Sequence, residues 1–252
     1  MGGAPGLTRA ADALRFGTEA ARPRPAVVAR AAREWLSTRD PRAWPAPPEG
    51  DGRPVLLVPG FLAGDASLRR LGAWLRTGGF RTYRSGIAAN VDCMEPLLAR
   101  LEIRAQDVVR RAGAPMVLVG QSRGGTLGRV LAARRPDLVQ TLVTLGSPVG
   151  DQLAVAPRTR VAVTAVGTLG SLGLPGLFSH ACMDGPCCAP SRAQLLEPFP
   201  GGVRYVAVVS PVDEVVRPEA CLDPAADLVE LHVSHVGMGV DATVWRALSA
   251  RL

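Results

Sequence analysis

The residues best suited to chemistry occupy positions 120–124, where the sequence reads Gly-Gln-Ser-Arg-Gly. This Gly-x-Ser-x-Gly pattern comes directly after an apolar segment typical of a β-strand and directly before a helical pattern. A strand that turns sharply into a helix forces Ser122 into a strained backbone conformation, and flanking glycines leave room for that turn. Unpaired N–H groups and the helix dipole at the start of the helix favour negative charge. The pattern predicts that Ser122 is a nucleophile for acyl transfer.

A serine hydroxyl needs a general base, and three histidines of the chain could supply it. His235 follows the last predicted strand, at the carboxyl edge of the sheet, where catalytic groups of open α/β sheets gather. His232 lies within that predicted strand, and His180 lies in a long insertion. We therefore expect His235 to be the base, with His232 as the second choice.

The base needs an acid that orients it. Asp213 comes in the loop after the penultimate predicted strand, between the nucleophile and the base in chain order. Its neighbour Glu214 is the alternative acid, whereas Asp223 and Asp227 are expected to be solvated turn residues. The sequence therefore predicts a Ser-His-Asp triad of Ser122, His235 and Asp213.

An acyl-transfer site also needs donors for the oxyanion. One expected donor is the backbone N–H of Arg123, directly after the nucleophile. The other is the N–H of Phe61, in the loop after the first strand, where Gly60 lets the backbone approach the substrate. Because both donors are main-chain groups, the Arg123 guanidinium is not expected to be catalytic.

These residues depend on a regular alternation of short apolar strands and longer amphipathic helices. Strands are predicted over 55–58, 80–83, 116–119, 141–145, 205–209 and 228–233, and helices over 66–76, 92–112, 124–135 and 241–252. Asp92 and Glu95 form a capping-box pattern at the start of the second helix. Near-continuous apolar strands separated by helices predict an α/β fold: a mostly parallel sheet of about six strands covered by helices on both faces.

Two segments lie outside this alternation. Residues 150–202 contain no clear strand and are too long for a structureless connection, so we expect an inserted lid in the domain 55–252. For residues 1–54 the sequence predicts an N-terminal extension of two short helices and a Pro-rich linker. Its second helix, 26–37, carries an apolar stripe expected to dock on the body, with contact to a membrane or a partner as the alternative. The members of the stripe are Val27, Val28, Ala31, Ala32, Trp35 and Leu36.

Three of the five cysteines fall in the predicted lid. His180, Cys182, Cys187 and Cys188 could form a metal cluster, but adjacent cysteines and the absence of Cys-x-x-Cys pairs disfavour zinc. A disulfide from Cys182 to Cys187 or Cys188 is the favoured alternative, and reduced, packed thiols are the other. No metal and no cofactor are expected at the site.

The composition fits a protein with a sizeable core, since 47% of residues are hydrophobic and 20% are charged. All 29 basic residues are arginine, which excludes lysine Schiff bases and phosphate-loop lysines. The net charge is +7, but the arginines are scattered and only 4% of residues are aromatic, so no nucleic-acid partner is expected.

No apolar run reaches the length of a membrane span and the N-terminus lacks a secretory signal, so we expect a cytoplasmic protein; peripheral membrane contact through the N-terminal helices is the alternative.

Several motifs in combination resemble bacterial α/β-hydrolases of the esterase and lipase type. They are Pro-Gly-Phe-Leu-Ala-Gly-Asp at 59–65, Gly-Gln-Ser-x-Gly-Gly at 120–125, Leu-Gly-Ser-Pro at 145–148, Ser-x-x-Asp at 210–213 and Ser-His-x-Gly at 234–237. The resemblance covers residues 50–252. It implies serine-dependent hydrolysis of a carboxylic ester, a lipid-like acyl ester among the candidates, with Ser122, Asp213 and His235 in the triad.

Two other functions remain open at this point. An acyltransferase or thioesterase would use the same triad with a different acceptor or leaving group. A non-catalytic, membrane-associated binding protein would rest on the N-terminal helices instead. The oligomeric state does not follow from the sequence.

Overall fold

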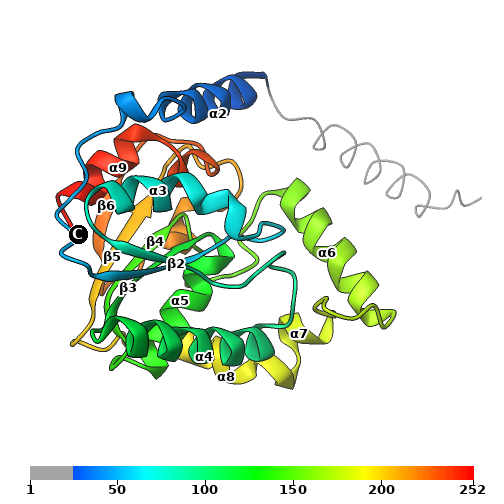
Figure 1. Cartoon of the computed structure of the whole chain (residues 1–252). Coiled ribbons are helices and arrows are strands. Elements are labelled where there is room, and N and C mark those ends of the chain that lie inside the picture. The colour runs from blue at the N-terminus through cyan, green and yellow to red at the C-terminus, as the bar shows by residue number, and fades with distance from the viewer. Residues whose placement is uncertain (1–24) are drawn as a thin grey trace, which may run out of the picture.

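The computed structural model describes residues 25–252 and centres on one parallel β-sheet (Figure 1). Its six strands follow the order β2-β1-β3-β4-β5-β6, and every neighbouring pair is parallel. The strands are β1 (Pro54–Val58), β2 (Arg81–Arg84), β3 (Met116–Gln121), β4 (Val139–Leu145), β5 (Arg204–Val209) and β6 (Asp227–Glu230). The predicted sheet is confirmed, although β6 ends before His232.

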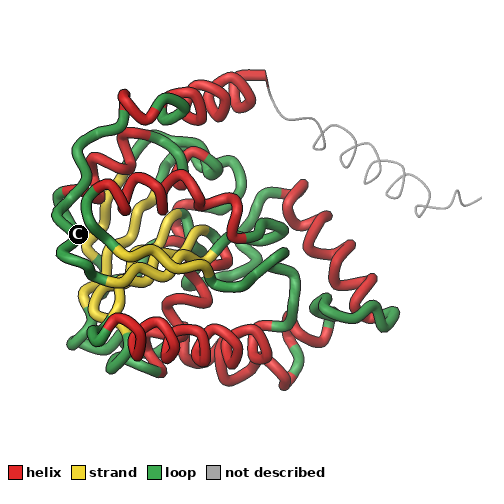
Figure 2. Tube along the Cα trace, in the orientation of Figure 1, coloured by secondary structure: helices red, strands yellow, loops and turns green. Residues whose placement is uncertain are grey.

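Helices cover both faces of this sheet (Figure 2). On β1, Val55 and Leu57 pack toward one side, with α3 (Arg69–Thr77) and α9 (Ala242–Ser249). Leu56 and Val58 pack toward the other side, with α4 (Met94–Ala112) and α5 (Arg123–Arg134). Because successive side chains of a strand point to opposite faces, continuous apolar strands require a core on each side. The predicted helices on both faces are confirmed.

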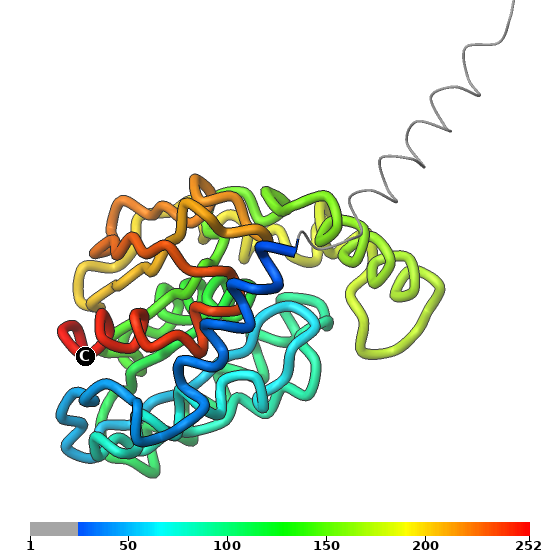
Figure 3. The backbone as a smooth tube through the Cα atoms, turned by 90° about the horizontal axis from the view of Figure 1, so that it is seen from above, coloured from blue at the N-terminus to red at the C-terminus, as the bar shows by residue number. Residues whose placement is uncertain are grey.

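The segment between β4 and β5 is helical. It contains α6 (Pro157–Ser171), α7 (Ala181–Asp184), the 3-10 helix η3 (Pro186–Cys188) and α8 (Ala189–Leu196). α8 packs beside α4 and α5, whereas α6 stands out from the body (Figures 1 and 3). We call residues 150–202 the cap segment below.

The helix predicted over 26–37 is α2 (Pro25–Ser37), and it lies across the molecule beside α9 (Figure 3). Its docking face differs from the expected one. Glu34 is the buried residue of α2, whereas Val28, Trp35 and Leu36 are 50%, 45% and 54% exposed. The prediction that the apolar stripe docks on the body is wrong, because polar contacts to the 234–241 loop orient the helix instead. The other predicted helix, within residues 1–24, lies outside the described residues.

The start of α4 also differs from its predicted capping box. Cys93 is the N-cap residue, and the carboxylate of Glu95 turns away from the helix terminus to bind α5 and α8. Arg134 donates to Glu95 at 2.8 and 3.0 Å, and the Ser191 N–H donates at 3.0 Å. Glu95 therefore joins three helices.

A buried ion pair provides a second link between α5 and the cap segment. Arg129 Nε lies 2.9 Å from Asp223 Oδ2, and both side chains are almost fully buried. The other guanidinium nitrogens donate to the carbonyls of Gln194 and Glu197 at the end of α8. The expectation that Asp223 is solvated is wrong, whereas Asp227 is exposed and pairs with Arg251.

Within residues 25–252, no helix combines the length and the apolar character needed to cross a lipid bilayer.

We expect Glu95→Gln to lower the free energy of unfolding by roughly 1–3 kcal/mol at neutral pH. The hydrogen bond from Arg134, together with Ser191, holds the pKa of this carboxyl below its ordinary 4.5 despite opposing burial. A lowered pKa stabilises the fold above the ordinary value, and this stabilisation is lost as the pH falls through the folded value. Denaturant unfolding should therefore show a difference between the two proteins that shrinks in acid.

The matched control on the same helix is Glu102→Gln, which removes the more exposed pair with Arg135. Its cost should stay below about 1 kcal/mol. Equal losses for the two variants, or a Glu95→Gln effect independent of pH, would contradict the assignment.

Candidate active site

Ser122 occupies the turn between β3 and α5. Its backbone has φ 51° and ψ −129°, a conformation that costs of order 1–3 kcal/mol in a residue with a side chain. A Cβ at Gly120 would collide with the backbone of residues 124 and 125, and one at Gly124 would collide with the Val58 carbonyl. The strand-to-helix turn and the need for glycine predicted from the sequence are both present.

Asp213 and His235 form a buried pair in the loops after β5 and β6. His235 Nδ1 lies 2.7 Å from Asp213 Oδ2, and their side chains are 8% and 1% exposed. The other carboxylate oxygen of Asp213 accepts from the N–H groups of Val215 and Val216 at 2.7 and 2.9 Å. If Nδ1–H donates to the carboxylate, Nε2 is left to accept a proton. The pair thus has the geometry of an oriented base.

The other residues that could serve as the acid or the base make different contacts. Glu214 accepts from the backbone N–H of His235 at 3.2 Å and so stabilises the loop. The imidazole ring itself contacts Asp213. His232 is exposed, in the loop after β6. His180 lies 3.1 Å from the Thr168 hydroxyl in the cap segment.

Ser122 and His235 line the same cavity, which has a volume of about 870 Å³. No hydrogen bond joins Ser122 Oγ to the imidazole in this conformation. The remaining wall is mainly apolar, and much of it comes from the cap segment. The apolar residues of the cavity wall include Leu153, Val155, Val163, Phe178 and Leu196 of the cap segment, and Val236 beside His235. The structure therefore brings Ser122 and His235 to one mainly apolar cavity, and Asp213 contacts His235 from a buried position outside the cavity wall.

Phe61 and Arg123, the residues predicted to supply backbone amides, also line this cavity. Among residues 25–252, neither N–H donates to another protein group. The amide of Ser122, by contrast, donates to the Leu145 carbonyl at 2.8 Å. Two unused amides beside a serine side chain suit the binding of an oxyanion.

Asn90 supports this loop and was missed by sequence reasoning. Its side-chain amide donates to the Pro59 carbonyl at 2.8 Å, and its main chain bonds to Leu62 and Ala63. Its side-chain oxygen accepts from the Arg123 guanidinium. Burial lowers the pKa of that guanidinium to about 10. The Arg123 side chain thus braces the loop through Asn90.

Two further polar contacts fix the His235 loop. Gln121, one residue before the serine, donates to the His235 carbonyl at 3.0 Å. Glu34 of α2 accepts from the Ser234 N–H at 2.8 Å and also from the Ser234 hydroxyl. Nothing in the local pattern of α2 distinguishes Glu34, because its partner lies about two hundred residues away.

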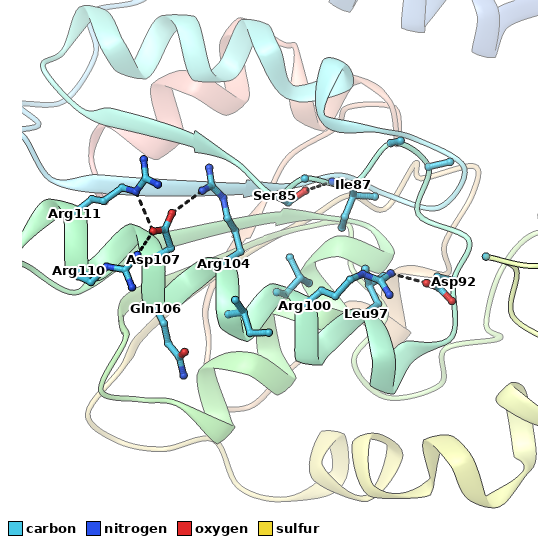
Figure 4. Close-up of a pocket in the computed structure, with 16 residues that line it drawn as sticks. Ser85, Ile87, Asp92, Leu97, Arg100, Arg104, Gln106, Asp107, Arg110 and Arg111 are labelled. Atoms are coloured by element: carbon cyan, nitrogen blue, oxygen red, sulfur yellow. Dashed lines mark hydrogen bonds and ion pairs between the residues drawn. The ribbon is translucent and has the colours of Figure 1, made fainter.

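A second pocket lies along the outer side of α4 and the loop before it (Figure 4). Its arginines point at carboxylates: Arg100 lies 2.5 Å from Asp92, and three others surround Asp107. Those three are Arg104, Arg110 and Arg111. Neither Ser122 nor His235 lines this pocket, so it is separate from the candidate active site.

Solved structures with the same topology come from hydrolases. The mature form of a Bacillus licheniformis lipase superposes with a TM-score of 0.60 at 14% identity, over 81% of this chain and 93% of the other. The protein has the α/β-hydrolase fold. A Paleococcus ferrophilus monoacylglycerol lipase matches with a TM-score of 0.57 at 16% identity, over 81% and 95% of the two chains.

A thioesterase domain from the curacin biosynthetic pathway shares this α/β-hydrolase fold, with a TM-score of 0.51 at 15% identity over 81% of this chain and 92% of the other. No protein-family profile matches the sequence. No curated protein sequence matches it either. At these identities the similarity establishes the fold.

We expect Glu34→Gln to reduce kcat by roughly 10–100-fold while leaving KM nearly unchanged. The NH₂ group that replaces one carboxylate oxygen cannot accept a hydrogen bond, so residue 34 keeps one of its two acceptor contacts with Ser234 and holds the loop that carries His235 less firmly. Steady-state hydrolysis of a short activated ester measures both constants. The control is Glu49→Gln, an exposed change in the same N-terminal region. A KM effect alone, or equal effects in both variants, would contradict a positioning role.

Proposed function

We propose that the protein is a serine hydrolase that cleaves carboxylic esters. The proposal rests on one observation above all: His235, paired with the buried Asp213, lines the same cavity as Ser122, which lies in a strained turn. A protein that only binds ligands has no use for an oriented imidazole beside a strained serine. We therefore favour catalysis over a non-catalytic binding role.

Each residue has a definite role in the proposed mechanism. Ser122 Oγ attacks the ester carbonyl while His235 Nε2 takes its proton. Asp213 stabilises the imidazolium, and the amides of Phe61 and Arg123 donate to the oxyanion. His235 then returns the proton to the leaving alcohol, and water repeats the sequence on the acyl-enzyme. The hydrogen bond between Ser122 and the base is expected to form in the complex with substrate, as such bonds often do.

The cavity supports an apolar acyl group as the preferred substrate part. Leu153, Phe178 and Leu196 of the cap segment face the serine across a space of about 870 Å³. Each CH₂ group of a hydrocarbon chain contributes about 0.8 kcal/mol of favourable free energy when it is buried. We therefore propose lipid-like acyl esters as the substrate class, and the cap segment as a lid over the acyl site.

Replacing Ser122 by Ala should reduce ester hydrolysis at least about 1,000-fold, since the nucleophile is lost. Hydrolysis of p-nitrophenyl esters of increasing chain length provides the measurement, and a fluorophosphonate should label wild type at Ser122. His235→Ala should have a similar effect, whereas His232→Ala is the matched control and should retain activity. Labelling at another residue, or activity retained by the Ser122 variant, would refute the triad.

The same assay distinguishes the acyltransferase and thioesterase alternatives. Matched oxygen esters and thioesters with one acyl chain should favour the oxygen ester in kcat/KM. A preference for the thioester, or transfer to an added alcohol in place of water, would keep the triad and replace the proposed reaction.

We also propose peripheral membrane contact through α2. Its outer face exposes Val28, Trp35 and Leu36, and the Arg70 guanidinium stacks over the Trp35 ring at 3.9 Å. Apolar side chains bordered by arginine suit an anionic bilayer surface. Cosedimentation with anionic vesicles should fall for the double variant Val28→Ser, Leu36→Ser and not for Ile103→Ser, an exposed apolar residue on α4. Equal cosedimentation of all three proteins would refute this contact.

A further inference from the structure

Four cysteine sulfurs converge beside the cap segment. Cys93, Cys182, Cys187 and Cys188 place their Sγ atoms within 4.8 Å of one another. Cys93 Sγ lies 3.4 Å from Cys188 Sγ and 4.0 Å from Cys187 Sγ, and Cys187 and Cys188 are 3.8 Å apart. All four thiols are free in this structure.

We propose that these four cysteines form a structural zinc site. Zinc bound to four thiolates at about 2.3 Å in a tetrahedron separates the sulfurs by about 3.8 Å. The three sulfur separations given above lie on either side of this value. Binding releases four protons: Zn²⁺ and four thiols give a zinc tetrathiolate of charge −2 and four H⁺. No electron transfer is involved.

In the folded chain, adjacent cysteines and the absence of Cys-x-x-Cys pairs no longer disfavour zinc. Cys93, about ninety residues before the lid cysteines, supplies the fourth sulfur at the start of α4, whereas His180 turns to Thr168. The adjacent Cys187 and Cys188 belong to the 3-10 helix η3, where both sulfurs reach the cluster. Metal ligation by Cys93 was not considered from the sequence because its partners are remote along the chain.

A zinc tetrathiolate would also place negative charge near the Arg123 guanidinium. Arg123 is partly buried, and among residues 25–252 no salt bridge joins it to a carboxylate: its nitrogens donate to the Asn90 side chain and the Asp92 carbonyl. Burial disfavours the charged guanidinium, and negative charge on Cys188 and on Asp92 opposes that effect. A dianionic centre beside a partly buried guanidinium is therefore electrostatically favourable for both groups.

The local hydrogen bonds suit thiolates. The Ser179 N–H points at Cys182 Sγ at a distance of 3.4 Å, the kind of contact that orients a metal ligand. Neighbouring thiols alone do not favour ionisation: burial and the adjacent Cys182 and Cys188 raise the pKa of Cys93. A divalent cation at the centre reverses this repulsion.

Other uses of the cysteines fit the geometry less well. A disulfide has an S–S length of about 2.05 Å and employs two sulfurs, whereas here four converge. Sulfurs this close enclose a single metal atom and not a cluster of several. Four thiolates in tetrahedral arrangement favour zinc over magnesium, calcium or manganese, which prefer oxygen ligands.

The site would attach the cap segment to the body. One ligand precedes α4, and the other three lie in α7 and η3. Cys182 and Cys188 also line the cavity with Ser122, so the metal would fix part of the proposed acyl wall without contacting the serine. This inference is independent of the proposed hydrolase activity, because its measurements report the metal alone.

The test begins with wild-type protein purified under reducing conditions and incubated with excess zinc. After removal of unbound metal, we expect one zinc per chain by elemental analysis. X-ray absorption should show four sulfur neighbours at about 2.3 Å. Cobalt substitution should give the thiolate charge-transfer and visible bands of tetrahedral cobalt. A chain that stays without zinc, or zinc with nitrogen and oxygen ligands, would overturn the proposal, as would a resting disulfide within the cluster that excludes metal.

Variants test the ligand set. Cys93→Ser should lower zinc affinity by at least about 100-fold, since loss of outer hydrogen bonds alone costs 10–100-fold. Two controls should retain zinc: His180→Ala, in the cap segment, and Cys221→Ser, a buried cysteine outside the cluster. Retention of full affinity by Cys93→Ser would overturn the assignment. If that variant fails to fold, the absorption and cobalt measurements on wild type still decide the question.

Discussion

Ser122 has a left-handed backbone because β3 turns into α5 within one residue, and the space for this turn exists only between two glycines. The turn places Ser122 and Arg123 in the wall of the same cavity. The surrounding strand ends must then approach closely: Gly60 lies against Ser122, and Gly146 lies against Asp213 and His235. The geometry of the candidate site follows from packing around this one turn, since a side chain at any of these glycines would crowd a neighbouring loop.

Polar side chains help to hold the loops in place. Gln121 and Glu34 anchor the segment that carries His235, and Asn90 anchors the loop that carries Phe61. Buried polar groups are costly when unpaired, and here each has a defined partner. A network of this kind fixes a single arrangement, which is what an acyl-transfer site needs if its groups are to align within fractions of an ångström.

The arginine-only basic charge also has a structural role. Arg134 joins α4 to α8 through Glu95, and Arg129 is buried with Asp223 while capping the end of α8. Both arginines use several nitrogens at once, which the planar guanidinium allows and an ammonium does not. Together with the cysteine cluster, these contacts attach the cap segment at its α7–α8 end, while α6 lines the cavity and packs against Val91 through Val166.

The sequence by itself determined what depends on local pattern. Strand and helix periodicity placed the sheet, and the glycine requirement of the turn identified Ser122. The order of the later loops then selected Asp213 and His235. Only the tertiary structure decided the contacts between remote residues: Glu34 with Ser234, Asp223 with Arg129, and Cys93 with the cap cysteines. Such pairs leave no periodic signal, because burial of a charged or thiol group depends on which distant segment lies opposite. For the same reason α2 was located correctly and its docking face was not.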